Sequence, residues 1–267
     1  MPTPPPRSTR TSRYGESPLS GQSPKKIALV TGANRGMGRD IARQLAERGV
    51  HVLLSGRDGA AVAGAAAELR GAGLDVEPLV LDITRTDGIA AAAARIEAEH
   101  GRLDILVNNA GIRIEEYGRQ PSEQPMGQWR ETFDTNLFGV VETTVALLPL
   151  LRKSPAGRIV NVSSLLASLA THSDPRSYAY SPMFKSLPAY SASKSALNSW
   201  TVHLAYELRE TPIKVNAVHP GYTKTDMNEG AGDLEIPEGA STAVTMALLD
   251  DDGPTGGYVH RGDLVPW

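Results

Sequence analysis

Tyr190 and Lys194 are the two side chains whose types and spacing point most directly to chemistry. Residues four apart on a helix share one face, so the phenol and the ammonium would be neighbours if residues 189–209 form a helix. A phenol ordinarily titrates near 10, and an adjacent ammonium lowers that pKa, which suits acid–base catalysis near neutral pH. Of the eight tyrosines, only Tyr190 has a lysine four residues later. The alternative is an exposed pair without a catalytic role.

Two further polar residues are candidates for the same reaction. Ser164 follows a predicted strand and could hydrogen-bond a substrate carbonyl; a serine in a turn is the alternative. Asn136 interrupts an apolar helical run, where a polar side chain needs a specific partner unless it faces solvent. With Tyr190 and Lys194 they make up the predicted catalytic set.

A glycine-rich loop indicates a second kind of site. An apolar run over 27–31 is followed by Gly32, Gly36 and Gly38, and a helical pattern begins near the last of them. A strand, a glycine turn and a helix N-terminus can hold a pyrophosphate, because the first helical amides are unpaired and glycine admits the phosphate closely. Such loops also occur without a ligand, and the G-x-x-x-G-x-G spacing differs from the usual dinucleotide fingerprint.

Strand-like and helical patterns alternate from residue 25 onward, and they predict the elements that position these residues. The alternation indicates a single-domain α/β, Rossmann-like, doubly wound fold over 25–267, with about seven parallel strands and helices on both faces. The predicted strands are 27–31, 50–54, 76–81, 103–107, 158–163, 213–218 and 257–260, and the helices lie near 38–48, 59–71, 87–100, 128–148, 189–209 and 238–249.

Ligands of such a sheet bind beyond the carboxyl ends of its strands, and several predicted strands end in polar residues. Asp82 could accept a hydrogen bond from an adenine amino group or cap the next helix. Asn108 could line the adenosine or brace a neighbouring strand, and the small residues Ala110 and Gly111 would let a cofactor pass. A polar turn without a ligand is the alternative for this stretch.

The residues after the second predicted strand bear on the choice between NAD and NADP. Gly56 stands where an NAD-binding fold has its ribose-binding carboxylate, and Arg57 follows it. Arg57, together with Arg35 in the glycine loop, would favour the 2′-phosphate of NADP, since a guanidinium offers phosphate two donors. Both arginines could instead be solvated. Asp58 complicates this interpretation, because a shift by one residue would return a carboxylate to the corner.

Composition narrows the classes of function. The 267 residues are 40% hydrophobic and 21% charged, and a net charge of −3 argues against a nucleic-acid partner. The absence of cysteine excludes disulfides and thiolate sites and fits a cytoplasmic location; no metal site is predicted. Apolar runs fall short of the roughly 20 residues of a membrane span. Residues 1–24 are expected to be a disordered tail rather than a targeting peptide.

Taken in order, these motifs resemble those of the short-chain dehydrogenase/reductase family, over residues 25–267. The ordered set is specific, although each motif alone is weak. Likeness to the carbonyl reductase and menthone (neomenthol) reductase branch rests on residues 219–227 and on the ending 255–267. The residues that carry the family resemblance are Thr31–Gly38, Asn108–Gly111, Asn136, Ser164, Tyr190, Lys194 and Pro220–Thr225.

The resemblance implies a role for each residue. Tyr190 would donate the proton in reduction, Lys194 would bind the nicotinamide ribose and lower the tyrosine pKa, and Ser164 would orient the carbonyl. Asn136 would support a water relay toward Lys194. NADPH/NADP+ would be held by Gly32, Asn34, Arg35, Gly36, Met37, Gly38, Arg57, Asp82, Ile83, Asn109, Ala110, Gly111, Tyr190, Lys194, Pro220, Gly221, Thr223 and Thr225.

One departure from the family pattern is the spacing of 26 positions between Ser164 and Tyr190, about twice the usual one. The extra segment, about 170–187, is expected either to cover a hydrophobic substrate or to form a surface excursion or subunit contact. Because insertions here accompany loss of oligomerisation in the carbonyl reductase branch, a dimer, a tetramer and a monomer all stay open. A lid is expected over about 226–237. The insertion contains His172, Tyr178, Tyr180, Met183 and Phe184.

The expected function is NADPH-dependent reduction of a small hydrophobic ketone or aldehyde. One alternative is a secondary alcohol dehydrogenase that works in the oxidative direction with NAD. Another is a dinucleotide-binding sensor without turnover, which would be expected to lose the catalytic tyrosine or lysine, whereas this chain keeps both. The sequence does not specify the substrate.

Overall fold

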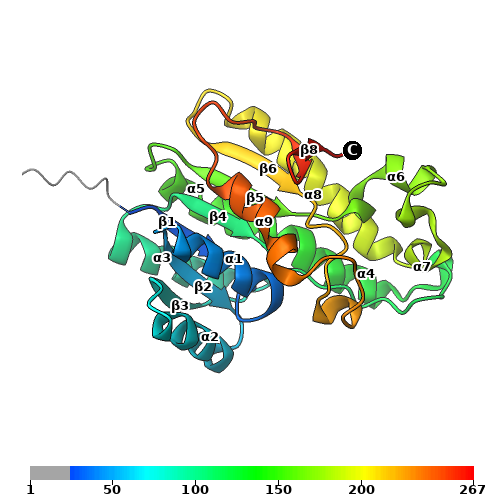
Figure 1. Cartoon of the computed structure of the whole chain (residues 1–267), viewed down its shortest axis with the longest axis horizontal. Helices are drawn as coiled ribbons and strands as arrows, with labels where there is room; N and C mark the ends of the chain where they lie inside the picture. Colours follow the sequence, from blue (N-terminus) through cyan, green and yellow to red (C-terminus); the bar gives the residue numbers. More distant parts are fainter. Residues whose placement is uncertain (1–24) are drawn as a thin grey trace, which may run out of the picture.

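The computed structural model describes residues 25–267, and the predicted tail over 1–24 lies outside the described residues. The strands form one sheet in the order β3-β2-β1-β4-β5-β6-β7-β8 (Figure 1). The first seven strands are parallel, and the last pairs antiparallel with its neighbour at one edge. The strands are β1 (Ile27–Val30), β2 (His51–Gly56), β3 (Val76–Val80), β4 (Ile105–Asn108), β5 (Arg158–Val162), β6 (Lys214–Val218), β7 (Tyr258–His260) and β8 (Asp263–Leu264).

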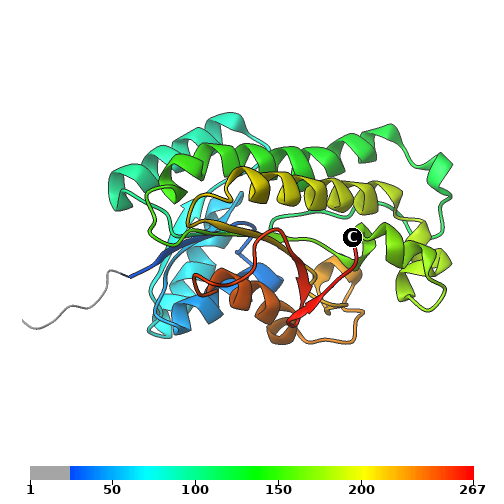
Figure 2. The ribbon, with the colours of Figure 1, turned by 90° about the horizontal axis from the view of Figure 1, so that it is seen from above.

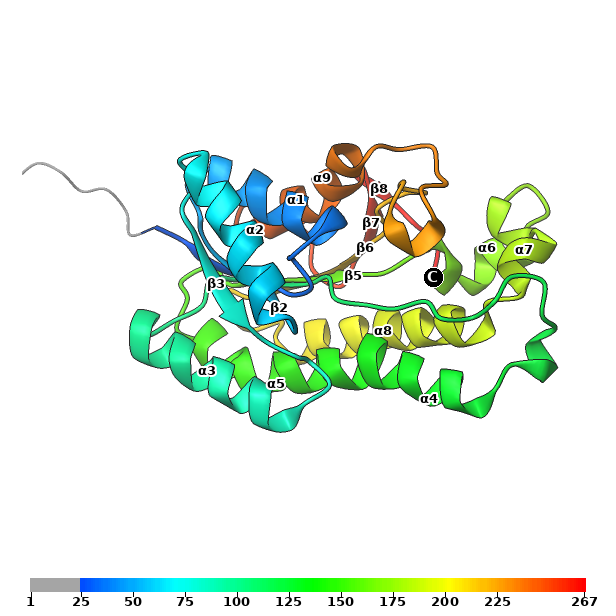
Figure 3. The same ribbon diagram turned by 90° about the horizontal axis from the view of Figure 1, so that it is seen from below.

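Helices cover both faces of the sheet, as Figures 2 and 3 show. One layer contains α1 (Gly36–Glu47), α2 (Gly59–Gly71) and α9 (Ile236–Ala247); the other contains α3 (Thr86–His100), α5 (Gly139–Leu151) and α8 (Pro188–Glu207). Strand residues alternate between the two cores, so that Val30 packs in the first and Leu29 in the second. Because both faces are buried, the strands are apolar throughout, and this gave the continuous apolar runs in the sequence.

The predicted Rossmann-like fold with its parallel sheet is confirmed, and the predicted elements lie within about three residues of the observed ones. Two features differ. The two-residue strand β8 has too few residues to show a pattern. The helix predicted over 128–148 consists of α4 (Met126–Phe133), a π-helical turn (Asp134–Phe138) and α5.

Helical structure is continuous from Met126 to Leu151, and among residues 25–267 this run alone is long and apolar enough to cross a membrane by length and composition. It packs against α3 and α8 inside the helical layer, and Val140 and Leu147 are 1% exposed. Core packing therefore accounts for part of its apolar side chains, whereas Met126, Phe138 and Val145 are 59%, 56% and 54% exposed.

The predicted insertion lies between β5 and α8, beyond the carboxyl ends of the strands (Figure 3). It contains the short helices α6 (Leu169–Ser173) and α7 (Pro182–Lys185), with a 3-10 turn at Tyr178–Tyr180 between them. The ring nitrogens of His172 lie 3.0 Å from the Leu166 carbonyl and 3.1 Å from the Ala179 carbonyl. This histidine therefore ties the turn to the end of β5.

Candidate active site

The order of the strands reverses between β1 and β4, and there the loops that follow the strands diverge and leave a crevice. A cavity of about 350 Å³ lies at this point. Every residue predicted to bind the cofactor lines it, from Gly32 in the first loop to Thr225 in the last, and so does Ser164. The predicted residues are thus brought together, with Asn136 as the exception.

The glycine loop after β1 is held against the end of β4. Thr31 Oγ1 accepts hydrogen bonds from the backbone N–H groups of Asn109 and Ala110, each at 3.0 Å. The Asn109 side-chain amide donates to the carbonyls of Thr31 and Gly32, at 2.9 and 3.1 Å. Gly32 has a φ of +61°, and a Cβ there would lie 2.9 Å from Ala110 Cα. The close approach of the two loops therefore requires glycine at this position.

The N-terminus of α1 opens toward the cavity. Arg35, the residue before the helix, has no acceptor atom with which to cap the first amides, and Gly36, Met37 and Gly38 line the cavity. Unpaired amides at the positive end of a helix dipole favour an anion. This end of the cavity can therefore hold a phosphate.

In the loop after β2, the side chain of Asp58 points to the start of α2 and not into the cavity. Gly56 and Arg57 line the cavity, whereas Asp58 caps α2 by accepting hydrogen bonds from the N–H groups of residues 60 and 61, at 3.0 and 3.1 Å. A Cβ on Gly56 would lie 3.0 Å from Asn34 Oδ1, which leaves little room for a side chain there. The one-residue shift that would bring a carboxylate into this corner is therefore not realised.

Asp82 follows β3 and Asn108 ends β4, and the two side chains make different contacts. The Asp82 carboxylate accepts hydrogen bonds from the Thr84 N–H at 3.0 Å and its hydroxyl at 2.7 Å, while Arg85 precedes α3. Asp82 therefore closes a turn beside the cavity and does not cap the helix. Asn108 is buried, and its amide donates to Asn161 Oδ1 of β5 at 2.8 Å, so it braces the neighbouring strand.

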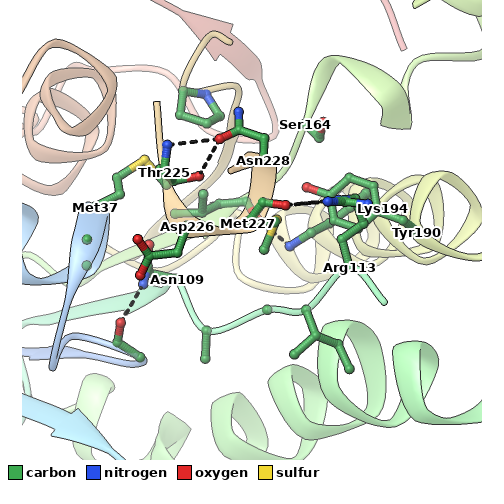
Figure 4. A pocket seen from close by; sticks show the side chains of 18 of the residues that line it. Met37, Asn109, Arg113, Ser164, Tyr190, Lys194, Thr225, Asp226, Met227 and Asn228 are labelled. Atoms are coloured by element: carbon green, nitrogen blue, oxygen red, sulfur yellow. Dashed lines mark hydrogen bonds between the residues drawn. The ribbon is translucent and has the colours of Figure 1, made fainter. Parts of the chain in front are cut away.

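The segment predicted as a lid starts across the cavity from the glycine loop. Asp226–Asn228 forms a 3-10 turn, in which the Thr225 N–H donates to Asn228 Oδ1 at 2.9 Å. Arg35 Nη1 lies 3.3 Å from the Asp226 carboxylate, and Arg113 Nε donates to the Met227 carbonyl at 3.1 Å. Figure 4 shows this turn over the middle of the cavity. Side chains from both ends of the cavity thus contact the same turn.

Tyr190 and Lys194 lie side by side on α8 and line the cavity, as does Ser164 at the end of β5 (Figure 4). Tyr190 is 8% exposed and Lys194 is 3% exposed. Lys194 Nζ donates to the carbonyl of Val162 at 2.8 Å. Ser164 Oγ accepts from the Leu166 N–H at 3.3 Å, which places its hydroxyl at the start of a 3-10 turn.

Burial shifts the pKa values of Tyr190 and Lys194 in opposite directions. It raises the pKa of the Tyr190 phenol above its ordinary value of 10, and a hydrogen bond with Ser164 opposes that rise. It lowers the pKa of Lys194 to about 8. The pKa of Tyr190 is thus raised overall, because burial has the largest effect on it, and the lowering by Lys194 stays a prediction. The phenol keeps its proton at neutral pH.

Asn136 lies behind the cavity wall, in the π-helical turn, and is fully buried. Its Oδ1 accepts from the Ile112 N–H at 2.8 Å, and its Nδ2 donates to the Ile112 carbonyl at 2.9 Å and to Ser193 Oγ at 3.0 Å. A Cβ on Gly111 would lie 3.2 Å from Asn136 Oδ1 and 3.3 Å from Lys194 Nζ. The side chain of Asn136 therefore holds the backbone after β4 beside Lys194; the water relay stays a prediction.

Aromatic side chains form the end of the cavity that faces away from the glycine loop. The ring of Tyr178 lies 5.3 Å from that of Phe184 and 5.9 Å from that of Tyr222, and all three residues line the cavity. Of the other insertion residues, Tyr180 is 48% exposed and Met183 39% exposed. The insertion therefore has two sides, an aromatic wall of the cavity and an outer surface.

Glu115 is a functional candidate that sequence reasoning missed. It is 3% exposed, and its Oε1 accepts hydrogen bonds from the N–H groups of Ala189 and Tyr190, at 2.6 and 3.0 Å. The residue before α8 is Leu187, whose side chain cannot cap a helix. Glu115 therefore caps the helix that carries the tyrosine, across 75 positions of sequence, and no local pattern signals such a contact.

His219, which also lines the cavity, is a buried histidine held neutral. Its Nδ1 accepts from the N–H groups of Leu165 and Gly221, at 3.1 and 3.3 Å, and its Nε2 lies 3.5 Å from the Tyr178 hydroxyl. Burial, with a smaller effect of His260, lowers its pKa to about 3. It links the insertion to the loop after β6. Its only sequence signal was its place before Pro220 in the quoted motif.

The chain is similar to known short-chain dehydrogenases in sequence and in structure. The profile described as short chain dehydrogenase matches residues 26–235. Short-chain dehydrogenase/reductase 1 of Saponaria officinalis is 37% identical over 91% of this chain and 96% of that protein, and (-)-isopiperitenone reductase of Mentha piperita is 33% identical over 89% and 96%. The structure of salutaridine reductase from Papaver somniferum matches with a TM-score of 0.77 and 29% identity, over 88% of this chain and 99% of that one.

Proposed function

Because the chain belongs to the short-chain dehydrogenase family, in its menthone reductase-like branch, and is an oxidoreductase of the CH–OH/C=O pair, we propose that it reduces a small hydrophobic ketone or aldehyde with NADPH. The observation that carries the proposal is the meeting of Tyr190, Ser164 and Lys194 in one cavity, at the switch point of the sheet. A phenol, a hydroxyl and an ammonium in this place suit the protonation of a carbonyl oxygen.

In the proposed reaction, Tyr190 donates its phenolic proton to the carbonyl oxygen. Ser164 donates a hydrogen bond to the same oxygen and orients the carbonyl. Lys194 supplies positive charge beside the phenolate that results, and this stabilises it. The nicotinamide, when bound, supplies the hydride that adds to the carbonyl carbon, which is the difficult part of the chemistry. The products are the alcohol and NADP+.

The preference for NADPH rests on the corner after β2. Gly56 has little room for a carboxylate, Arg57 faces the cavity, and Asp58 is occupied as a helix cap. Arg35 lies at the mouth of the same cavity, where its partner Asp226 is 73% exposed in its side chain. Two guanidinium groups near one corner favour a 2′-phosphate over a free ribose hydroxyl.

The substrate class rests on the aromatic wall of Tyr178, Phe184 and Tyr222. Such a wall contacts rings and alkyl groups, whereas it offers few partners to a charged substrate. A hydrophobic ketone or aldehyde therefore suits the cavity better than a sugar acid.

Tyr190→Phe tests the mechanism. NADPH consumption would be measured on panels of cyclic ketones, aromatic ketones and aldehydes, with Tyr206→Phe as a matched control, because Tyr206 lies on the same helix and is 68% exposed. We expect a loss of at least about 100-fold in kcat for Tyr190→Phe and no change for the control. Retention of most activity on every accepted substrate would refute the proposed acid.

Arg57→Ala tests the cofactor preference, with the exposed Arg70→Ala on α2 as its control. We expect the wild-type protein to prefer NADPH to NADH. In Arg57→Ala, KM for NADPH should rise roughly tenfold while KM for NADH stays unchanged. Wild type that shows little selectivity, or faster alcohol oxidation with NAD+, would favour the oxidative alternative.

A further inference from the structure

Two histidines and a glutamate meet at the amino ends of the strands, far from the cavity. His51 begins β2, Glu77 lies in β3, and His100 is the last residue of α3. Gly56 at the cavity is five steps of about 3.3 Å along the strand from His51, so the cluster lies about 17 Å away in that direction. Figure 3 shows β2, β3 and α3 together at the end of the molecule opposite to α6 and α7.

The two imidazoles and the carboxylate converge on one point. His51 Nε2 lies 3.4 Å from Glu77 Oε2, and His100 Nε2 lies 3.5 Å from the same oxygen. The three ligand atoms lie within 4.8 Å of one another. Ligand atoms bound to one zinc ion at about 2.0–2.1 Å in a tetrahedron are about 3.3–3.4 Å apart, so both nitrogen–oxygen separations match those of a zinc site.

The two imidazole nitrogens of the cluster lack hydrogen-bond partners within the described protein. Within residues 25–267, Nε2 of His51 and Nε2 of His100 are buried and have no hydrogen-bond partner. A buried polar atom without a partner costs free energy, which a bound ligand would recover. The two side chains keep 20% and 16% of their surface exposed, so the cluster lies just below the surface.

The groups around the cluster orient it as partners of metal ligands do. His51 Nδ1 lies 2.8 Å from Asp75 Oδ1, so an N–H there donates to the carboxylate, and in the neutral ring this leaves the lone pair on Nε2. Glu77 receives a hydrogen bond from Arg95 on its other oxygen, Oε1, and so keeps Oε2 turned toward the two rings. Carboxylate–histidine pairs of this kind fix the tautomer and raise the basicity of the ligand.

We propose that His51 Nε2, Glu77 Oε2 and His100 Nε2 form a binding site for one Zn2+ ion. Two imidazoles and one carboxylate suit this borderline ion, and the fourth tetrahedral position would be open to water. The ion would join β2, β3 and the end of α3, three elements that meet near the edge of the sheet. No metal site is predicted from the sequence, because these ligands lie on three separate elements.

The test uses the full chain without a histidine tag, freed of metal by a chelator and without cofactor. Calorimetric titration with ZnCl2 is expected to give one saturable site, weakened at least tenfold in His100→Gln and in Glu77→Gln. His203→Gln, an exposed histidine of α8, should bind as wild type does. Asp75→Asn should weaken binding about 10–100-fold while leaving the three ligands in place.

Two further readouts separate a specific site from adventitious binding. At a free Zn2+ concentration about a hundred times Kd, Tm of wild type should rise by about 5–10 °C, and that of His100→Gln should not. Co2+ in place of Zn2+ should give the intense visible absorption of a tetrahedral site. The proposal is overturned if no saturable heat is observed, or if the two ligand variants bind Zn2+ as tightly as wild type and His203→Gln do.

Discussion

Lys194 Nζ donates a hydrogen bond to the carbonyl of Val162, at 2.8 Å, in the wall of the cavity. The residue is 3% exposed, and burial lowers its pKa from 10.5 to about 8. A buried ammonium beside a main-chain carbonyl of β5 is kept at a cost in stability. The same charge lies next to the phenol of Tyr190, where the proposed reaction needs it.

Lys194→Met is expected to abolish reduction and to stabilise the fold. The pKa of Lys194 is lower in the folded protein than in the unfolded chain. At neutral pH the charged lysine therefore lowers the free energy of unfolding, by up to about 3 kcal/mol. Urea unfolding checks this at pH 7. In wild type, stability from this group should rise as pH rises from about 8 to 10.5, and the variant should lack that rise. A variant less stable than wild type at pH 7 would contradict the prediction.

The pH profile of reduction should report the same group. The raised pKa of Tyr190 keeps the proton donor in place, whereas Lys194 loses its charge as pH rises through about 8. We therefore expect kcat/KM for NADPH-dependent reduction to fall above about pH 8. Lys194→Arg should move this fall to higher pH in whatever activity it keeps, since guanidinium stays charged. An unchanged profile in the variant would show that another group limits the reaction.

Glu115→Ala should lower both stability and kcat. It removes the cap from α8 and leaves the N–H groups of Ala189 and Tyr190 unpaired, which costs about 1–2 kcal/mol. Thermal unfolding and initial rates measure the two effects. Glu116→Gln is the matched control, because its side chain is 73% exposed. Equal behaviour of the two variants would mean that the cap is not needed to position Tyr190.

Asp226→Asn should tighten the binding of NADPH. It releases Arg35 from its ion pair and removes a negative charge from the mouth of the cavity, where the proposed 2′-phosphate would lie. Because the pair is exposed, we expect a change of about two- to fivefold in KM for NADPH, larger at low salt, with KM for NADH unchanged. The exposed Glu229→Gln serves as control. Weaker NADPH binding in Asp226→Asn would argue for a direct role of the carboxylate.

Phe184→Ala should affect large substrates more than small ones. The ring packs edge-on to Tyr222 with 5.7 Å between centroids, so its removal shortens the aromatic wall. We expect KM for bicyclic or aromatic ketones to rise about tenfold or more, with a smaller change for a short aldehyde. Tyr180→Ala, on the outer side of the insertion, should leave both values unchanged. A uniform change across all substrates would point to a structural effect.

The regular elements were predictable because their signals are local. Burial on both faces makes each strand a continuous apolar run, and the helix period fixes the i, i+4 pairing of Tyr190 with Lys194. The carboxyl ends of parallel strands were expected to bring the polar residues that follow them to one edge of the sheet, and those residues line one cavity. The remaining features depend on contacts between distant segments. The sequence around Asn136 indicated that it needs a partner but not that the partner is Ile112, and nothing near Glu115 indicated that it caps α8. The pKa of Tyr190 depends on burial that only the fold determines.

Backbone groups form one end of the cavity, and side chains form the other. The glycine loop holds its end with backbone groups and with close contacts that exclude side chains, whereas side chains of Tyr178 and Phe184 from a surface insertion form the other end. Apart from His172 and Tyr178, which contact the segments after β5 and β6, residues of the insertion can therefore change without altering the sheet or the proposed catalytic residues. Directed evolution restricted to 169–187 should give variants with new substrates and an unchanged reaction, and natural divergence of such a protein would follow the same course.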